Sequence, residues 1–403
     1  MWERLSRLLV LLILIAVPVF ADVVTDASAN TVAIVASARL STPEGNRIVA
    51  TTQTAVFEAV NAATRRYPAG RLNLKAADKT SVEAAVAAAT RTVLLKMLPT
   101  QKDAIEENYR QALASIADGE SKSAGIRLGE DAATAVIESR KDNNTGAVES
   151  FRPVTQPGVY VPTAIPVFST WIKRKPWALE RADQFRPGPP PDLKSDIWAR
   201  DYNEIKSMGV KNGSKRTAEQ TSIASFWETT GTGVYWPVVL SVANSRNREV
   251  TQNARLLAII GEAVDDAIIA VFDAKYKYNF WRPVTAIRNG DIDGNDATER
   301  DPSWAPFIDT PMHPEYPCAH CIVASTIGTV LKAELGETPV PELSSISPTL
   351  AGSTRRWTSI DEFVREVSEA RICDGVHYRN STEVGTAMGK KVGELVYSKF
   401  PLK

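Results

Sequence analysis

The chain has 403 residues, of which 44% are hydrophobic and 23% are charged, so it is long enough to bury a large core. Its 47 lysine and arginine residues balance 47 aspartate and glutamate residues, and no basic stripe is interleaved with aromatic residues. Such a chain has no general attraction for nucleic acid or for an anionic membrane, which argues against nucleic-acid binding.

The first 21 residues, MWERLSRLLVLLILIAVPVFA, have the pattern of a cleavable secretory signal peptide. Arg4 and Arg7 precede an apolar run of about 13 residues, which is followed by the ending Val-Phe-Ala. Because a membrane span needs about 20 apolar residues, an uncleaved anchor is the less favoured alternative. We expect export to the periplasm or the medium, a mature chain from about Asp22, and no stable membrane span after cleavage.

Helical periodicity dominates the rest of the chain. In residues 80–98, apolar residues recur at three- and four-residue spacing after a Thr/Ser start, with Glu83 placed for a capping box. Alternating strand patterns are nearly absent. The predicted fold is therefore all-α, with helical bundles in two four-helix-bundle-like halves. Similar helical signals cover residues 27–40, 46–64, 101–118, 121–140, 214–228 and 250–281.

Residues 141–200 interrupt this pattern. They contain RPVTQPGVYVPTAIPVF and QFRPGPPPDL, which are too rich in proline for continuous helix. A loop this long is usually functional or wraps the surface. We interpret residues 22–403 as one α-helical domain, because the Ala-rich helices before the loop need the C-terminal helices to complete a core, and we expect an anion site within residues 250–403.

The first motif that carries chemistry is DAKYKYNFWRPV. Lys275 and Arg282 are seven residues apart, which on a continuous helix is a rotation of about 700° and places both cations on one face. Pro283 is predicted to end this helix, because the residue before a proline disfavours the α conformation. Two cations can then meet one anion, although an isolated pair of solvated surface charges would look the same.

The second motif, HPEYPCAHC, holds two of the three histidines and two of the three cysteines of the chain. Pro317 is followed by a helical pattern, whose first-turn amide groups would be available to an anion. His320 falls in that first turn, where it could give or take a proton near neutral pH. The alternative is a histidine that is hydrogen-bonded in the core or at a cap.

The third motif is SEARICDGVHYRNSTEVG. Arg371 and His377 are six residues apart, so a continuous helix would point them about 120° away from each other. Gly375 offers a break between them. If the next helix begins at a Ser381/Thr382 cap, His377 lies in the turn and can reach the target of Arg371.

Together, Lys-x6-Arg-Pro, Pro-x-x-His and Arg-x5-His resemble the motifs of the vanadium-dependent haloperoxidases and of the type 2 phosphatidic acid phosphatases that share their pocket. The segment KYKYNFWRPVTAIR, followed by HPEYP, is most similar to the sequences of a bacterial haloperoxidase-like branch. The resemblance continues through PGVYVPT, QFRPGPPP and RTAEQTSIASFWE, so it covers most of the mature chain. It implies an α-helical fold of two bundles with the anion pocket in the C-terminal half.

The resemblance also implies roles for the matching positions. Lys275, Arg282 and Arg371 would neutralise the oxygens of bound vanadate, a task that suits planar arginines. His377 would bind the vanadium through a ring nitrogen. His320 would be the acid/base that takes a proton from hydrogen peroxide, and Lys275 would polarise the peroxide for attack by a halide.

Phosphate has the shape and charge of vanadate, so the same pocket could hold it and hydrolyse a phosphate ester. His377 would then form a phosphohistidine and His320 would protonate the leaving oxygen. The length of the chain and the amino-acid sequence around Arg282 favour the haloperoxidase branch over acid phosphatases. The expected partners are thus hydrogen peroxide and a halide, with a phosphate ester as the alternative; the sequence leaves a homo-oligomer open.

His313 lies seven residues before His320. By resemblance, this position is histidine in algal bromoperoxidases and phenylalanine in a fungal chloroperoxidase. The resemblance therefore implies a catalytic role for His313 and favours bromide or iodide over chloride. A loop histidine beside Pro314 is the equally weighted alternative.

The chain departs from the family pattern near the anion. The usual Pro-Ser-Gly-His is Pro-Cys-Ala-His here, so Cys318 replaces a hydroxyl by a weaker thiol donor. Ala319 keeps the backbone amide but adds a methyl group where glycine is usual. Ala370 replaces the serine before Arg371. These changes predict a reduced affinity for vanadate.

The cysteines leave three interpretations open. A free Cys318 thiol beside a source of hypohalous acid would be oxidised, unless a disulfide with Cys321 protects it. Cys373 is the other possible partner. Alternatively, His313, His320 and the two neighbouring cysteines could bind zinc or copper, but this would leave the three distant cations without a role.

A helical protein with a degenerate, non-catalytic phosphate site is the remaining alternative for the function of the whole chain.

Overall fold

The computed structural model describes residues 22–141, 151–162, 164–245 and 247–402, so the predicted signal peptide lies outside the described residues. These residues form thirteen α-helices, four short 3-10 helices and a single two-stranded sheet, with these bounds: α1 Val23–Ser37, α2 Thr42–Thr64, α3 Val82–Met97, η1 Pro99–Gln101, α4 Lys102–Ala114, α5 Glu120–Ser139, η2 Trp171–Lys173, α6 Asp196–Met208, α7 Ala218–Phe226, α8 Thr232–Ala243, α9 Val250–Tyr278, α10 Pro283–Arg288, η3 Gly290–Ile292, α11 Ala319–Leu335, β1 Leu343–Ile346, η4 Pro348–Leu350, β2 Thr354–Trp357, α12 Ile360–Cys373 and α13 Arg379–Ser398. The predicted all-α fold class is confirmed.

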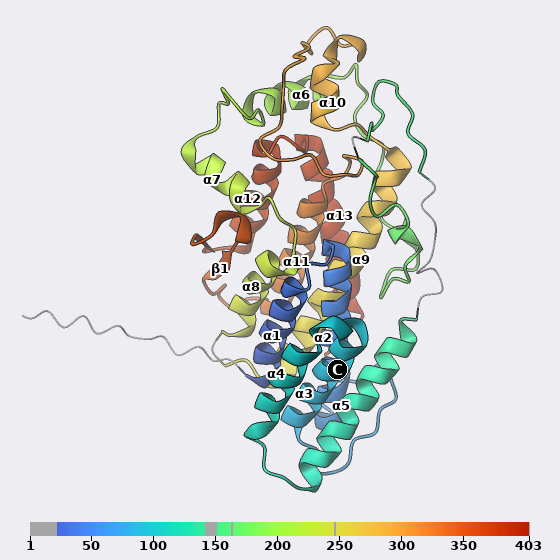
Figure 1. The fold of residues 1–403 in the computed structure, drawn as a ribbon, viewed down its shortest axis with the longest axis vertical. Coiled ribbons are helices and arrows are strands. Elements are labelled where there is room, and N and C mark those ends of the chain that lie inside the picture. Colours follow the sequence, from blue (N-terminus) through green and yellow to red (C-terminus); the bar gives the residue numbers. More distant parts are fainter. Residues whose placement is uncertain (1–21, 142–150, 163, 246, 403) are drawn as a thin grey trace, which may run out of the picture.

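The first bundle packs α2, α3 and α5 against each other, with α1 and α4 beside them (Figure 1). Small residues let these helices approach closely. A Cβ atom on Gly125 or Gly129 of α5 would lie 2.4 Å from the carbonyl oxygen of Ser81 and 2.3 Å from that of Ala85. The Ala-rich sequence of α3 therefore selects close backbone packing over large side chains.

The long helix α9 belongs to both halves of the molecule. It packs against α2 on one side and against α11 and α13 on the other. All but a few of its residues are buried, including charged ones that pair with side chains or amides of other segments, such as Asp266 and Asp273. Because α9 crosses from one bundle to the other, its last turn reaches the second bundle at Lys275.

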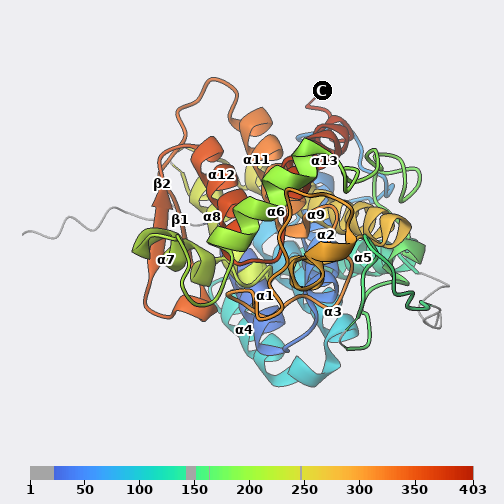
Figure 2. The same cartoon turned by 90° about the horizontal axis from the view of Figure 1, so that it is seen from above.

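The second bundle consists of α9, α11, α12 and α13. Here Gly385 and Gly389 of α13 face α11, where added Cβ atoms would lie 2.6 Å from the carbonyl oxygen of Cys318 and 2.3 Å from that of Ile322. Helix α6 lies across the end of this bundle, next to α10 (Figures 1 and 2). The antiparallel pair β1 and β2 lies at the side of the bundle, beside α8.

The described part of the Pro-rich segment lies along α9 as irregular chain. Asp266 of α9 accepts hydrogen bonds from three successive amides, those of Trp177 at 2.6 Å, Ala178 at 2.8 Å and Leu179 at 2.9 Å. Arg186 forms a two-pronged ion pair with Asp273, about two turns nearer the site. Buried carboxylates on α9 thus fix the path of this loop.

Two apolar cores support the site. The larger one contains residues from α1 to the C-terminal end and joins the two bundles. The smaller one is aromatic and includes Trp198 of α6, which stacks on Trp281 at a centroid distance of 5.8 Å. The single domain proposed for residues 22–403 stays a prediction. No described helix is both long and apolar enough to cross a membrane.

Several local predictions were wrong. Ser81 caps α3 through the amide of Ala84, so Glu83 stands one position too early for the predicted capping box and instead accepts the Ser81 hydroxyl. Helix α6 begins inside the segment predicted to be irregular, and α8, which contains Pro237, was not predicted. The helix predicted over residues 250–281 ends at Tyr278, since Asn279 adopts a left-handed conformation with φ of 49°.

Candidate oxyanion site

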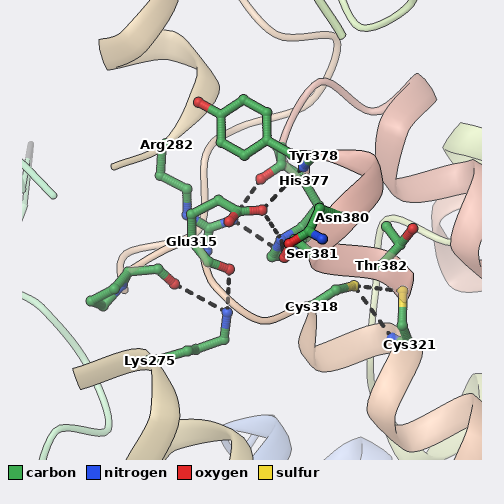
Figure 3. A network of polar contacts seen from close by, with 12 residues as sticks. Lys275, Arg282, Glu315, Cys318, Cys321, His377, Tyr378, Asn380, Ser381 and Thr382 are labelled. Carbon is green, nitrogen blue, oxygen red and sulfur yellow. Dashed lines mark hydrogen bonds and ion pairs between the residues drawn. The ribbon is translucent and has the colours of Figure 1, made fainter. Parts of the chain in front are cut away.

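The three motifs meet at the end of the second bundle, although they are distant in sequence. The last turn of α9, the start of α11 and the turn between α12 and α13 supply the side chains, and the segment before α11 runs between them (Figure 3). Lys275, Arg282, Arg371 and His377 are each at most 1% exposed. The structure therefore brings together the residues that the sequence assigned to one anion.

Lys275 is positioned by the last turn of α9. Its Nζ donates hydrogen bonds to the carbonyl oxygens of Pro314 at 3.1 Å and Glu315 at 2.7 Å (Figure 3). Burial, reinforced by the nearby charge of Arg282, lowers the pKa of Lys275 well below its ordinary value. Since Nζ donates to two neutral carbonyls, the protonated form of the amine has one donor left for a ligand.

Arg282 enters the site from a different element than predicted. It caps the N-terminus of α10, and Pro283 begins that helix instead of ending α9. Its Nε donates to the His313 carbonyl at 2.9 Å and its Nη1 donates to the Val376 carbonyl at 2.8 Å. Burial lowers its pKa to about 10, so the guanidinium remains charged at neutral pH.

Arg371 is the third cation, in the last turn of α12. Its Nη1 donates to the carbonyl of Trp227 at 2.7 Å and pairs with Asp374, while its buried Nε has no hydrogen-bond partner. Burial raises the pKa of Asp374 to about 7 against the opposing effect of Arg371. The unsatisfied Nε is a donor that a bound anion could use.

His377 lies in the turn between α12 and α13, as predicted, next to Gly375 with φ of 78°. The next helix begins at Arg379 with Tyr378 as its N-cap, so the predicted Ser381/Thr382 cap was wrong. Burial, together with Arg282, lowers the pKa of His377 well below its ordinary value, so the ring is neutral at neutral pH.

The contacts of His377 determine its tautomer. Its Nε2 lies 3.4 Å from Nη1 of Arg282, a group that can only donate, so Nε2 carries the lone pair. The proton is then on Nδ1, which donates to Oε1 of Glu315 at 2.8 Å. This arrangement presents an unprotonated Nε2 to the cationic side of the site.

Glu315 is a site residue that sequence analysis missed. It is fully buried, and its Oε1 also accepts the amide of Tyr378 at 3.1 Å (Figure 3). Burial raises its pKa to about 7, against the lowering effects of Lys275 and Arg282. The available signal was a lone carboxylate between two prolines in HPEYP, directly before the helix that carries His320.

His320 is the second residue of α11 and is 6% exposed. Its Nε2 is buried without a hydrogen-bond partner. Burial, with the charge of Arg371, lowers its pKa well below the ordinary value. A neutral imidazole with an unpartnered nitrogen, in the first turn of α11, is suited to accept a proton.

His313 contacts the site through Arg282. Its ring packs edge-on against Phe272 at a centroid distance of 5.3 Å, and its Nδ1 lies 3.0 Å from Nη2 of Arg282. Its burial, together with the charges of Lys275 and Arg282, lowers its pKa well below the ordinary value. The same Nδ1 lies 3.1 Å from the Pro314 carbonyl oxygen, so the structure places the neutral His313 ring between Arg282 and that carbonyl.

The three replaced positions surround the start of α11. Cys318 is the N-cap of α11, and Ala319 is the first residue of the helix. Ala370 is buried in α12 beside Arg371. All three cysteines are free thiols, and Sγ of Cys321 lies 2.8 Å from Sγ of Cys318. Among the described residues, no group of three or more His, Cys, Asp or Glu side chains is arranged to hold a metal ion, which argues against the zinc or copper alternative.

These features define an all-α protein of two bundles that share one long helix, with a buried cationic site at the end of the second bundle. Residues 255–401 match the family model for the VCPO second helical-bundle domain. The resemblance to the vanadium-dependent haloperoxidases that the three motifs indicated is thereby confirmed over the second bundle. No curated protein matches the sequence significantly.

Solved structures extend this similarity to the whole fold. The first bacterial vanadium-dependent iodoperoxidase superposes with a TM-score of 0.80 at 23% identity, over 96% of this chain and 98% of its own. A bacterial vanadium-dependent chloroperoxidase is also similar, at 17% identity. Its apo form superposes with a TM-score of 0.71 over 89% of this chain and 93% of its own. Its holo form superposes with a TM-score of 0.70 over 94% of this chain and 93% of its own.

Proposed function

We propose that this protein is a vanadate-dependent haloperoxidase that oxidises a halide with hydrogen peroxide. The observation that carries the proposal is the arrangement of three buried cations around His377, whose Nε2 is unprotonated. Lys275, Arg282 and Arg371 would hold the equatorial oxygens of vanadate, and His377 would bind the vanadium through Nε2. The similarity of the fold to bacterial vanadium-dependent peroxidases supports the same assignment.

The residues present fit a tetrahedral oxyanion. All the acceptors that Lys275 and Arg282 contact are neutral carbonyls or histidine nitrogens. Glu315 is the carboxylate whose charge opposes those of Lys275 and Arg282, so a bound oxyanion would further reduce the cost of burying both cations. The unpartnered Nε of Arg371 and Nε2 of His320 are further groups that a ligand could satisfy.

The residues of the chain would share the chemistry as follows. Bound vanadate would supply a Lewis acid that activates hydrogen peroxide without changing its own oxidation state. His320 would accept the peroxide proton at its nitrogen, since the ring is neutral at working pH. The remaining N–H of Lys275 would donate to an oxygen of the reacting group, and Glu315 would keep the proton of His377 on Nδ1.

The similarity of the fold to bacterial vanadium-dependent peroxidases favours this function over a phosphatase, and the neutral state of His320 in the site without an anion agrees with it. A phosphatase needs the protonated imidazole to donate to the leaving oxygen, and burial with Arg371 disfavours that form. A haloperoxidase needs the neutral ring as a base. Phosphate hydrolysis and simple phosphate binding are therefore outcomes of the test below and not the primary proposal.

We propose bromide or iodide as the halide. The histidine at position 313 supports this choice by family resemblance, and the solved iodoperoxidase shares the fold over nearly the whole chain. We also propose that the protein is exported, on the strength of residues 1–21.

The decisive test is halogenation of a phenolic dye by the purified protein with hydrogen peroxide and bromide or iodide, before and after addition of orthovanadate. Vanadate-dependent halogenation that is lost in His377→Ala is the expected result. Release of nitrophenol from nitrophenyl phosphate, with no halogenation, would replace the proposal by the phosphatase function. Binding of vanadate without either activity would leave a binding protein.

A further inference from the structure

Two thiols lie in contact in the first turn of α11. Cys318 is the N-cap of this helix, and its Sγ accepts the amide hydrogen of Cys321 at 3.3 Å. The Sγ atoms of the two residues are 2.8 Å apart, and both side chains are fully buried (Figure 3). A Cys-x-x-Cys pair at a helix N-terminus is a geometry in which thiols react readily.

The pair lies beside the cationic site. The amide of Cys318 donates to the carbonyl of Ser381 at 3.1 Å, next to the turn that carries His377. Against the opposing effect of burial, the hydrogen bond from Cys321 and the positive charges of Arg371 and Lys275 lower the pKa of the Cys318 thiol. Helix α13 closes the other side, since Gly385 approaches both cysteines. Both cysteines lie in the same turn of α11 as His320, so a small oxidant that reaches this histidine also reaches the turn that carries the two sulfurs.

We propose that Cys318 and Cys321 are an oxidation site for hydrogen peroxide, and that the disulfide formed there weakens the binding of the oxyanion. The disulfide itself requires no bound anion, whereas its effect on affinity rests on the proposed function. The pair would therefore make occupancy of the site depend on exposure to peroxide.

The reaction balances with one peroxide. The sulfur of Cys318 attacks one peroxide oxygen, an S–O bond forms, the O–O bond breaks, and the departing oxygen leaves as water after taking up a proton. The sulfur of Cys321 then attacks the sulfenic acid, an S–S bond forms, the S–O bond breaks, and a second water leaves. Two thiols lose two electrons and two protons, and hydrogen peroxide is reduced to two waters.

The consequence for the anion follows from the hydrogens that are lost. In the dithiol, Cys321 can donate its S–H to Cys318 or rotate, and the Cys318 thiol can donate to an oxyanion at the start of α11. In the disulfide neither sulfur carries a hydrogen. The anion therefore loses one hydrogen-bond donor. Formation of the S–S bond also draws Sγ of Cys318, which accepts the Cys321 amide, towards Sγ of Cys321.

The first experiment measures the oxidation alone. The full-length protein, free of vanadate and halide, is treated with a small excess of hydrogen peroxide, denatured, alkylated and mapped by mass spectrometry. We expect a peptide containing residues 318–321 that is lighter by two hydrogens and unalkylated, while Cys373 is still alkylated. Alkylation of both cysteines as in the untreated protein, or recovery of sulfinic or sulfonic acid in place of the disulfide, would overturn the proposal.

Two variants sharpen this result. Cys373→Ala is the matched control: its sulfur lies at the end of α12, so the 318–321 disulfide should form as in the wild type. Cys321→Ser removes the resolving thiol but keeps Cys318 as the cap, so a sulfenic acid at Cys318 should become trappable by dimedone. Loss of disulfide formation in Cys373→Ala would instead show that Cys373 is the true partner.

The second experiment measures the affinity for orthovanadate and for inorganic phosphate in the dithiol and disulfide forms, after removal of all reductant. We expect up to about tenfold weaker binding in the disulfide form, as for the loss of one hydrogen bond to a charged group. Equal affinities would refute the effect on binding. If neither anion binds in either form, the proposed function fails as well, whereas the mass measurement still decides whether the disulfide forms.

Discussion

At the scale of single residues, the pair of His377 and Glu315 determines what the site can do. The carboxylate fixes the imidazole tautomer because it accepts the Nδ1 proton at 2.8 Å, and Arg282 approaches the opposite nitrogen. A carboxylate behind a metal-binding histidine orients the ring and increases its basicity. Glu315 is therefore expected to act through His377, as a positioning residue.

Glu315→Gln tests this role. Its amide can donate to Nδ1 as well as accept from it, so the tautomer would no longer be fixed. We expect vanadate affinity and peroxidase activity to fall by about 10- to 100-fold, measured by titration with orthovanadate and by dye halogenation. Unchanged vanadate affinity, with normal folding by circular dichroism, would rule out the positioning role.

Asp374 offers a prediction for the pH dependence of stability. Its pKa is raised from 3.8 to about 7 by burial, so the folded state holds a proton that the unfolded state has lost between these values. The free energy of unfolding of the wild type should therefore fall, relative to that of Asp374→Asn, as the pH rises from about 4 to about 7. The change is a few kcal/mol at most, since one pKa unit is about 1.4 kcal/mol.

Urea unfolding at several pH values measures this difference. A constant difference between wild type and Asp374→Asn across the window would show that Asp374 ionises alike in both states. Because the asparagine cannot pair with the charge of Arg371, the comparison rests on the slope with pH and not on the absolute offset.

At the scale of elements, the approach of α13 to α11 positions the turn that carries His377. The close contact depends on glycine, since a Cβ on Gly389 would lie 2.3 Å from the carbonyl oxygen of Ile322. That oxygen belongs to the backbone of α11, so one helix must move to make room. A single added methyl group at this contact would therefore shift α13 relative to α11, and with it the turn that carries His377.

Gly389→Ala should consequently destabilise the protein by about 1 to 3 kcal/mol, the usual cost of overpacking, despite the better helix propensity of alanine. It should also weaken vanadate binding, because the turn with His377 precedes α13. Gly233→Ala is the matched control: it lies in α8 with no atom within 4 Å of an added Cβ, and should be neutral or slightly stabilising. Equal midpoints in urea for both variants would contradict this account.

At the scale of the whole molecule, the site is assembled from several segments of the second bundle and of the chain that connects its helices. Helix α9 passes from the first bundle to the second and supplies Lys275, while α10, α11 and the α12–α13 turn supply the remaining groups. An oxyanion that contacts all of them links segments about a hundred residues apart. Its binding should therefore stabilise the fold as a unit.

Orthovanadate or phosphate should raise the unfolding temperature by a few degrees, because a ligand at 100 times its dissociation constant adds about 2.7 kcal/mol to the free energy of unfolding. The shift in unfolding temperature should increase with anion concentration. The shift caused by vanadate should vanish in His377→Ala. Differential scanning calorimetry measures it. An equal shift in wild type and His377→Ala would place the anion elsewhere.

The sequence by itself determined much of this protein. Helical periodicity gave the all-α class, Pro317 gave the start of the helix that carries His320, and Gly375 gave the break that places His377 in a turn. These features are local: they depend on which backbone conformations a few neighbouring residues prefer. The same local reasoning failed at the end of α9. Pro283 was expected to end this helix, but the helix ends earlier, at the left-handed Asn279, and Pro283 begins the next helix.

Only the tertiary structure decided the rest. Glu315 and His377 are 62 residues apart, and no periodicity predicts that the carboxylate of one accepts the proton of the other. The same holds for the carbonyl of Trp227, which orients Arg371 from another element. Such contacts arise from the packing of helices around α9, and they fix the charge, the tautomer and the unpaired donors on which the chemistry of the site depends.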